Sequence, residues 1–371
     1  MFKIKIKNFS KRKLPELIME LIGSFSIDGD LQYHADLSQL KYYIPPSDPN
    51  NANYDLGYNV TSICHKPDLY TKLDDILKWI SDNFNQLEKP LSPNEGHWLS
   101  VDFVCNRGAL KKLFSSPYKK DDGWIICASK YRDTIYLCEY YTDKRASNVS
   151  FNIKNKVYSH GLKFIQYMVA DHPAHKPNLS VPFNECKKFR CVFKTKFGDH
   201  SLLYTGKIDS ISSEQPMEDT LIGKKFKIIE MKTLSLYNKN GNLYGKLNPD
   251  RVVDWWSQNY LTGIDTTICG LKVKNAVRMI KEYPTHILPQ FSKIDCNVDK
   301  CKMFCEIFLN HVKRIVIKDH DECMYKFQWD SSTKDIVRYS EESPNNEMYT
   351  FLKPWFISKT EKHKFPINVR N

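Results

Sequence analysis

The sequence predicts an α+β fold in which mixed central β-sheets are flanked by helices. Alternating apolar stretches, which are typical of strands, recur along the chain, and amphipathic stretches with helical spacing lie between them. The chain has 371 residues, of which 41% are hydrophobic, so it can bury a large core. No low-complexity linker or clear boundary interrupts it, and residues 1–371 are therefore expected to form a single domain.

In the first half of the chain, a polar loop is followed by a helix and then by a series of strands. The proline- and asparagine-rich residues 45–54 predict a surface loop. Residues 70–84 predict an amphipathic helix, with apolar side chains at Leu73, Ile76, Leu77, Ile80 and Phe84. Beyond it, alternation predicts strands over 98–105, 124–128 and 134–141, with a short helix at 107–110 between the first two.

The second half alternates helices and strands in the same way. Residues 158–170, 249–261 and 301–317 have helical spacing, and Pro249 suits the first turn of its helix. Strands are predicted over 189–197, 201–208, 225–231 and 266–274. Gly198-Asp199 should join the first two of these strands as a hairpin.

Composition limits the possible environments and partners. The formal net charge of +12 favours a polyanionic partner, and nucleic acid is the first candidate. The N-terminus alternates lysine with apolar residues and has no signal-peptide core, and no apolar run is long enough to cross a membrane. The 11 cysteines follow no disulfide framework, so free thiols in a reducing compartment are expected.

Three of these cysteines, with a histidine beyond them, raise the question of a zinc site. The spacing of Cys296, Cys301, Cys305 and His311 fits no standard zinc pattern. Cys301 and Cys305 instead recur with Phe304 and Leu309 at helical spacing, so a buried helix face is expected.

A candidate nuclease site lies between residues 206 and 232. Asp209 ends one predicted strand, and Glu230 and Lys232 end a nearby one, where alternation places them on one face and turns Met231 away. An Asp beside Glu-x-Lys is the signature of PD-(D/E)xK nucleases. In these enzymes carboxylates bind Mg²⁺ or Mn²⁺ and the lysine positions water. The alternative is that these are ordinary solvated strand ends.

Five segments, in order along the chain, resemble the DXO family of RNA decapping and 5′-end exonuclease enzymes. They are residues 102–108, 161–168, 200–209, 229–233 and 255–261. The resemblance implies a DXO-like fold with a PD-(D/E)xK-nuclease-like core. It also implies that Arg107 contacts an RNA 5′ phosphate and that Gln258 is the active-site glutamine.

Two of the four acidic metal ligands implied by this resemblance are missing. The four positions are occupied by Ile165, Lys207, Asp209 and Glu230. Four carboxylates carry −4, whereas two carboxylates and one ammonium carry −2 + 1 = −1. Hard divalent cations need several anionic oxygens, so no two-metal site and no catalysis are expected. Lys207 could bridge the two remaining acids in place of a metal. The alternative is weak binding of one Mg²⁺ or Mn²⁺ by Asp209 and Glu230.

The remaining polar residues of the site admit two interpretations. In the first, Arg107, Lys232 and Gln258 still bind an RNA 5′ phosphate without cleaving it. In the second, Arg107 and Lys232 pair with Asp209 and Glu230 in a buried ion network. Gln166, one residue out of register with the missing acid, is expected to point elsewhere, and Asn106 stands where the family usually has an aromatic residue.

A damaged site on this fold implies a pseudoenzyme that acts in the nucleus as an RNA-end or partner-binding factor. The insect germline protein Cutoff is a family member of this type. Its role would imply Rhino- and Deadlock-like partners at heterochromatic piRNA clusters. There it would protect nascent transcripts from 5′-end processing, decay and termination, and support transposon silencing. The alternatives are an active metal-dependent decapping, pyrophosphohydrolase or 5′–3′ exoribonuclease enzyme with altered ligands, and a scaffold whose pocket is vestigial.

Overall fold

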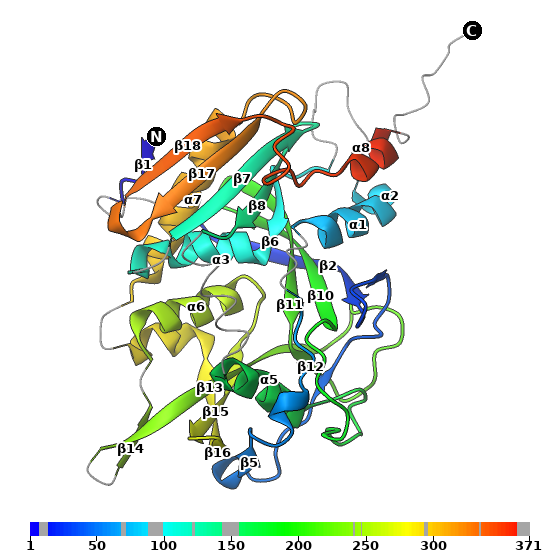
Figure 1. Cartoon of the computed structure of the whole chain (residues 1–371), viewed down its shortest axis with the longest axis vertical. Helices are drawn as coiled ribbons and strands as arrows, with labels where there is room; N and C mark the ends of the chain where they lie inside the picture. The colour runs from blue at the N-terminus through cyan, green and yellow to red at the C-terminus, as the bar shows by residue number, and fades with distance from the viewer. Residues whose placement is uncertain are drawn as a thin grey trace.

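Two mixed β-sheets with flanking helices make up the protein, as the sequence predicts (Figure 1). The structure is a computed structural model that describes residues 1–6, 14–67, 72–87, 99–120, 123–142, 156–239, 242–245, 247–292, 296–333 and 335–361. In Figure 1 the strands β7, β17 and β18 form the upper part, β13, β15 and β16 form the lower part, and α3 and α6 lie between them.

The first sheet has ten strands. Their order is β1 (Phe2–Lys3), β18 (Ile336–Glu342), β17 (Met324–Asp330), β7 (Gly123–Tyr131), β8 (Thr134–Tyr140), β6 (Phe103–Asn106), β11 (His200–Ile208), β10 (Lys188–Phe197), β2 (Leu17–Ile27) and β3 (Tyr33–His34). Its neighbours are antiparallel except that β6 runs parallel to both β8 and β11. The predicted hairpin joins β10 to β11, and Gly198 adopts the left-handed φ of +58° that this turn requires.

The second sheet supplies the other half of the site. Its order is β5 (Tyr54–Asp55), β16 (Ala276–Pro284), β15 (Thr266–Val273), β13 (Lys227–Lys239), β12 (Ser210–Ser212), β4 (Tyr42–Tyr43) and β9 (Val169–Ala170), and β14 (Asn242–Gly245) also pairs with β13. The chain leaves the first sheet at the end of β11 and enters the second at β12. Asp209 is the single residue between these strands.

Seven α-helices accompany the sheets in the described part of the chain. They are α1 (Asp74–Asp82), α2 (Phe84–Leu87), α3 (Arg107–Ser115), α5 (Lys156–Met168), α6 (Pro249–Tyr260), α7 (Val298–Ile315) and α8 (Pro354–Glu361). The side chain of Asn248 caps α6 by accepting a hydrogen bond from the Arg251 N–H, with Pro249 at the first helical position as predicted. None of the described helices is long and apolar enough to span a membrane.

The helix face predicted for α7 is confirmed. Cys301, Phe304, Cys305 and Leu309 are all buried in the main core, which lies between this helix, α3, α6 and the first sheet. All 11 cysteines are free thiols, and Cys64 alone among them is exposed. Burial raises the pKa of Cys301 and of Cys305, which suits packing rather than reactivity.

Several predicted boundaries were wrong. The strand expected over 98–105 begins only at Phe103, and residue 98 lies outside the described residues. The helix expected over 70–84 runs from 74 to 82, because the chain turns before a second short helix; residues 70–71 are not described. The helix expected over 158–170 ends at Met168, because Val169 and Ala170 form the short strand β9 and pair with β4. The predicted loop at 45–54 contains a 3₁₀ turn, Pro49–Asn51, and ends in β5.

One boundary matters for the site. The strand expected over 225–231 continues to Lys239, so Glu230 and Lys232 lie inside β13 and not at its end. The strand continues because β15 pairs with it in parallel from Glu230 to Ser235, and β14 pairs with the residues beyond. The acid and the lysine are therefore held by a ladder on a central strand, which fixes their positions firmly.

Candidate functional site

The candidate site lies where the two sheets meet. The end of β11 and the link to β12 present Lys207 and Asp209, β13 presents Glu230 and Lys232, and α6 presents Gln258. Lys207 Nζ lies 3.9 Å from Asp209 Oδ1, and Lys232 Nζ donates a hydrogen bond to Glu230 Oε1. Lys232 Nζ also lies 3.4 Å from Gln258 Oε1. The structure thus brings together residues from three separate segments, and the first and last of them, Lys207 and Gln258, are 51 positions apart in the sequence.

Alternation along β13 sorts its side chains as predicted. Glu230 and Lys232 face the site, whereas Met231 is buried in a separate apolar cluster with Phe164 and Ile268. The backbone N–H of Met231 donates to Asp209 Oδ2 at 3.0 Å. This hydrogen bond ties the acid at the sheet junction to the strand that carries the second acid.

The two carboxylates differ in their proton affinity. Burial and the nearby charge of Glu230 raise the pKa of Asp209. Burial also opposes ionisation of Glu230, but the ammonium of Lys232 and the guanidinium of Arg107 outweigh it, so the pKa of Glu230 is lowered. Glu230 is therefore the firmly ionised member of the pair, and its charge is already matched by Lys232.

Lys232 pairs with Glu230, as in the buried ion network considered from the sequence, but the other expected pairings differ. Lys207 reaches Asp209 but does not bridge the two acids, because Lys232 holds Glu230 instead. Arg107 forms no ion pair with either acid within the described residues. Its Nη1 donates to Thr262 Oγ1 at 2.9 Å, since the side chain lies against Gly206, where an added Cβ would come within 3.2 Å of the guanidinium.

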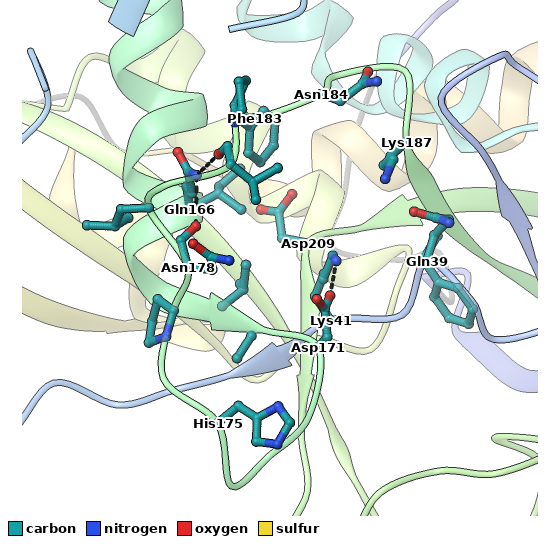
Figure 2. Close-up of a pocket in the computed structure, with 18 of the residues that line it drawn as sticks. Gln39, Lys41, Gln166, Asp171, His175, Asn178, Phe183, Asn184, Lys187 and Asp209 are labelled. Atoms are coloured by element: carbon teal, nitrogen blue, oxygen red, sulfur yellow. Dashed lines mark hydrogen bonds and ion pairs between the residues drawn. The ribbon is translucent and has the colours of Figure 1, made fainter. Parts of the chain in front are cut away.

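The helix α5 contributes an aliphatic side chain, Ile165, at a position where the family resemblance implies an acid. Ile165 packs against the cluster that contains Phe164 and Met168, and it lines a cavity together with Lys207 and Asp209. The neighbouring Gln166, expected to point elsewhere, lines the same cavity. Its Nε2 donates to the carbonyl oxygens of Asn178 and Val181 at 3.0 and 2.8 Å (Figure 2).

This cavity has a volume of about 820 Å³ and opens beside Asp209. Figure 2 shows Asp209 near its centre, with Lys187, Asn184 and Phe183 on the surrounding loop and strand. These wall residues were not singled out from the sequence. They come from a segment without a motif, and the only available signal was the paired lysines at 187–188 before a predicted strand.

Asn106, which stands where the family usually has an aromatic residue, forms hydrogen bonds that connect neighbouring elements. Its Nδ2 donates to the Lys72 carbonyl at 2.8 Å, and its Oδ1 accepts from Arg190 Nη2 at 2.8 Å. Arg190 also pairs with Asp75 at 3.2 Å. Asn106 therefore links the start of α3 to β10 and to the segment before α1, and this part of the site holds its shape without an aromatic residue at 106.

The donor set fits a pair of divalent cations poorly. No group of three or more His, Cys, Asp or Glu residues gathers in ligand geometry within the described ranges. Two carboxylates remain, one hydrogen-bonded to Lys232 and the other faced by Lys207, and a hydrocarbon occupies the fourth position. Mg²⁺ and Mn²⁺ prefer several oxygen ligands, and each ammonium repels them.

The fold and the arrangement of Asp209, Glu230 and Lys232 on neighbouring strands define a protein of the PD-(D/E)xK nuclease class. A family model described as "RAI1 like PD-(D/E)XK nuclease" matches residues 20–357. The chain therefore belongs to the RAI1-like family, in which the DXO enzymes also fall.

Individual relatives agree with this assignment. The bovine "Decapping and exoribonuclease protein" is 29% identical over 347 residues, covering 91% of this chain and 83% of the relative. The Drosophila melanogaster "Protein cutoff" is 22% identical over 301 residues, covering 80% and 76%. A crystal structure of Candida albicans Rai1 with pU5-Mn²⁺ has the same fold, with a TM-score of 0.78, 17% identity, and coverage of 97% and 99%.

Proposed function

We propose that this chain is a non-catalytic member of the RAI1-like family that acts in the nucleus as an RNA-end or partner-binding factor. One observation carries the proposal: two ammonium groups face the two carboxylates that remain of the implied metal site. The four charges of Lys207, Asp209, Glu230 and Lys232 sum to −2 + 2 = 0. With four carboxylates and the same Lys232, the sum would be −4 + 1 = −3.

A neutral cluster lacks the charge that two-metal phosphoryl chemistry requires. Divalent cations would lose hydration and receive few anionic ligands in return. Without the metal, no activated water and no clamp for the charge of the transition state are available. Removal of a single preorganised electrostatic element commonly costs about 10²–10³ in rate. What remains is a partly buried cluster of paired charges.

The more specific role that we propose is the one implied by Cutoff. The chain would protect nascent piRNA-cluster transcripts from 5′-end processing, decay and termination, in a complex with Rhino- and Deadlock-like proteins at heterochromatin, and so support transposon silencing. The net charge of +12 supports contact with nucleic acid. The chain is 22% identical to Protein cutoff and 29% identical to the bovine relative.

The catalytic part of the proposal is tested by metal and substrate together. Mn²⁺ is titrated into the protein calorimetrically, and 5′-triphosphate and capped RNA are incubated with it under the same conditions, with the bovine relative as positive control. We expect neither heat of specific binding nor product. Tight Mn²⁺ binding with product release would overturn the pseudoenzyme proposal.

The binding part is tested with Arg107→Glu and with partner capture. An RNA-end reader should lose affinity for RNA in this variant. A scaffold with a vestigial pocket should keep RNA binding unchanged and still retain Rhino- and Deadlock-like proteins in co-purification. If the wild-type protein binds neither RNA nor these partners, both roles are refuted.

The alternative is an active metal-dependent decapping, pyrophosphohydrolase or 5′–3′ exoribonuclease enzyme with altered ligands. The position of Asp209 next to β13 favours this alternative. The carboxylate of Asp209 accepts a hydrogen bond from the backbone N–H of Met231, the residue that follows Glu230. One weakly held Mg²⁺ or Mn²⁺ between the two acids would then support slow turnover. Metal-dependent product that disappears in Asp209→Ala would establish this alternative.

A further inference from the structure

Two cysteines, Cys64 and Cys186, lie where two loops of the chain meet. The loop that follows β5 carries Cys64, and the loop that links β9 to β10 carries Cys186. The backbone N–H of Cys64 donates to the Phe183 carbonyl at 2.9 Å, and the N–H of Glu185 donates to the Cys64 carbonyl at 2.9 Å. These two hydrogen bonds form a parallel β-bridge that pairs Cys64 with Asn184.

A turn directly after this bridge brings Cys186 to the side chain of Cys64. The backbone N–H of Cys186 donates to Asn184 Oδ1 at 2.9 Å, which holds the turn. Burial raises the pKa of the Cys186 thiol, and the neighbouring Cys64 thiol raises that pKa further through its charge and a hydrogen bond. A disulfide needs Cα atoms about 4.4–6.8 Å apart, and the bridge and the turn together bring the two backbones close.

The two thiols differ in their access to solvent. Cys64 is the one exposed cysteine among the 11, whereas Cys186 is 5% exposed. A second pair, Cys127 and Cys138, lies directly opposite on β7 and β8, but these residues are only 0% and 1% exposed. A dissolved oxidant therefore reaches Cys64 first and finds Cys186 beside it, while the pair in the core is shielded.

The bridge joins one wall of the 820 Å³ cavity to the rest of the protein. Phe183 and Lys187, on either side of the bridge, line the cavity (Figure 2). On the other side of the wall, Glu185 Oε2 lies 3.3 Å from His65 Nδ1. The Nε2 atom of the same histidine lies 3.3 Å from Ser159 Oγ on α5. A covalent bond at the bridge would therefore act on the segment that forms this wall.

We propose that Cys64 and Cys186 form a redox-sensitive modification site, at which a peroxide joins them as a disulfide that fixes this wall of the cavity. The Cys64 thiolate attacks one oxygen of hydrogen peroxide, the O–O bond breaks, and a sulfenic acid and one water form. The Cys186 sulfur then attacks the Cys64 sulfur, the S–O bond breaks, and a second water leaves. In total, two thiols and one peroxide give one disulfide and two waters, so both sulfurs are oxidised and the peroxide is reduced. A dithiol reverses the modification by thiol–disulfide exchange.

The bond would restrict the chain because it closes the long loop from residue 64 to residue 186. A cross-link of this kind removes conformational freedom from the unfolded chain, and longer loops lose more of it. It also opposes local opening of the two loops, which only the bridge and its side-chain contacts hold together at this point. The oxidised protein should therefore melt at a higher temperature and open less at residues 183–187 than the reduced protein.

The test treats the reduced full-length protein with hydrogen peroxide, removes the excess, and counts free thiols in denaturant. We expect the count to fall from 11 to 11 − 2 = 9, and peptide mass spectrometry should find Cys64 linked to Cys186. Dithiothreitol should restore all 11 thiols. In Cys64→Ser, a change at an exposed position, no thiol should be lost. In Cys186→Ser, oxidation should stop at a sulfenic acid on Cys64, which dimedone traps.

Cys323→Ser, which removes a buried thiol outside the bridge, is the matched control and should still form the same disulfide. Thermal melting of each reduced variant verifies folding. Hydrogen exchange of the amides of residues 183–187 should be slower in the oxidised protein than in the reduced protein. Peroxide treatment that leaves all 11 thiols free, that oxidises Cys64 without consuming Cys186, or that links Cys64 of two chains would overturn the site. A disulfide that forms without slowing this exchange would overturn the claim that it fixes the cavity wall.

Discussion

Restoring the two missing acids should restore a metal site. In Ile165→Glu/Lys207→Glu, the charge of the cluster formed by positions 165, 207, 209, 230 and 232 changes from −2 + 2 = 0 to −4 + 1 = −3. The substitution at 207 acts at short range, because Lys207 Nζ lies 3.9 Å from Asp209 Oδ1. An ammonium that repels a cation is thereby replaced by a carboxylate that can bind it. We therefore expect measurable Mn²⁺ binding in the double variant.

The size of the effect follows from the same distance. Two unit charges at about 4 Å interact by roughly 4 kcal/mol at an effective dielectric of 20. Lys207 is 36% exposed, so solvent screening reduces this value substantially. Allowing for this screening and for the carboxylate that is gained, we expect an increase in Mn²⁺ affinity of at least about a hundredfold, or ~2.7 kcal/mol. Without metal, four clustered carboxylates should repel one another and lower the melting temperature.

Calorimetric titration of Mn²⁺ measures the affinity, and thermal melting with EDTA or Mn²⁺ measures the linked stability. Lys224→Glu makes the same change of charge away from the cavity and serves as the control. The double variant should melt lower than wild type in EDTA and should recover with Mn²⁺. If a correctly folded double variant binds Mn²⁺ no better than wild type, the loss of these two acids does not explain the poor fit of the site to metal.

Three further predictions concern stability and reactivity. The hydroxyl of Tyr158, Lys66 and His65 together outweigh burial and lower the pKa of Glu185. Its contribution to stability is therefore complete above the unfolded value of about 4.3 and is lost as pH falls through the lower folded value, so wild type should lose stability more steeply on acidification than Glu185→Gln. In Gly270→Ala the new methyl would lie 2.7 Å from the buried Phe164 ring, which should destabilise by ~1–3 kcal/mol in denaturant unfolding. Native alkylation followed by peptide mass spectrometry should label Cys64 and spare the ten buried thiols.

Each of these has a distinct contrary result. Parallel acid-unfolding curves for wild type and Glu185→Gln would show that the hydrogen bonds to this carboxylate add no stability. An unchanged midpoint in Gly270→Ala would show that α5 can move away from β15 without loss. Modification of Cys301 or Cys305 before global unfolding would contradict the close packing of α7 against the main core.

Local patterns were sufficient for much of the fold. Alternation and helical spacing predicted β7, β8, β10, β11 and β15, the hairpin at Gly198, and the buried face of α7, because these features depend on neighbouring residues along one element. Boundaries failed where a distant segment determined the outcome. The helix α5 ends early because Val169 and Ala170 pair with β4, and β13 continues past residue 231 because β15 pairs with it. Neither partner can be recognised from the local sequence.

The sequence by itself determined which residues occupy the site: two acids, a lysine and an isoleucine where four acids were expected. Side-chain identity sets charge and ligand chemistry, and no folding can return the missing carboxylates. Only the tertiary structure decided how the remaining charges pair. Glu230 pairs with Lys232 and not with Lys207, and Arg107 donates a hydrogen bond to Thr262. Lys187 and Lys188, which belong to a segment without a motif, line the cavity. Such pairings depend on distances of a few ångströms between strands that are far apart in the chain, and Coulomb interactions at that range are set by packing and not by sequence spacing.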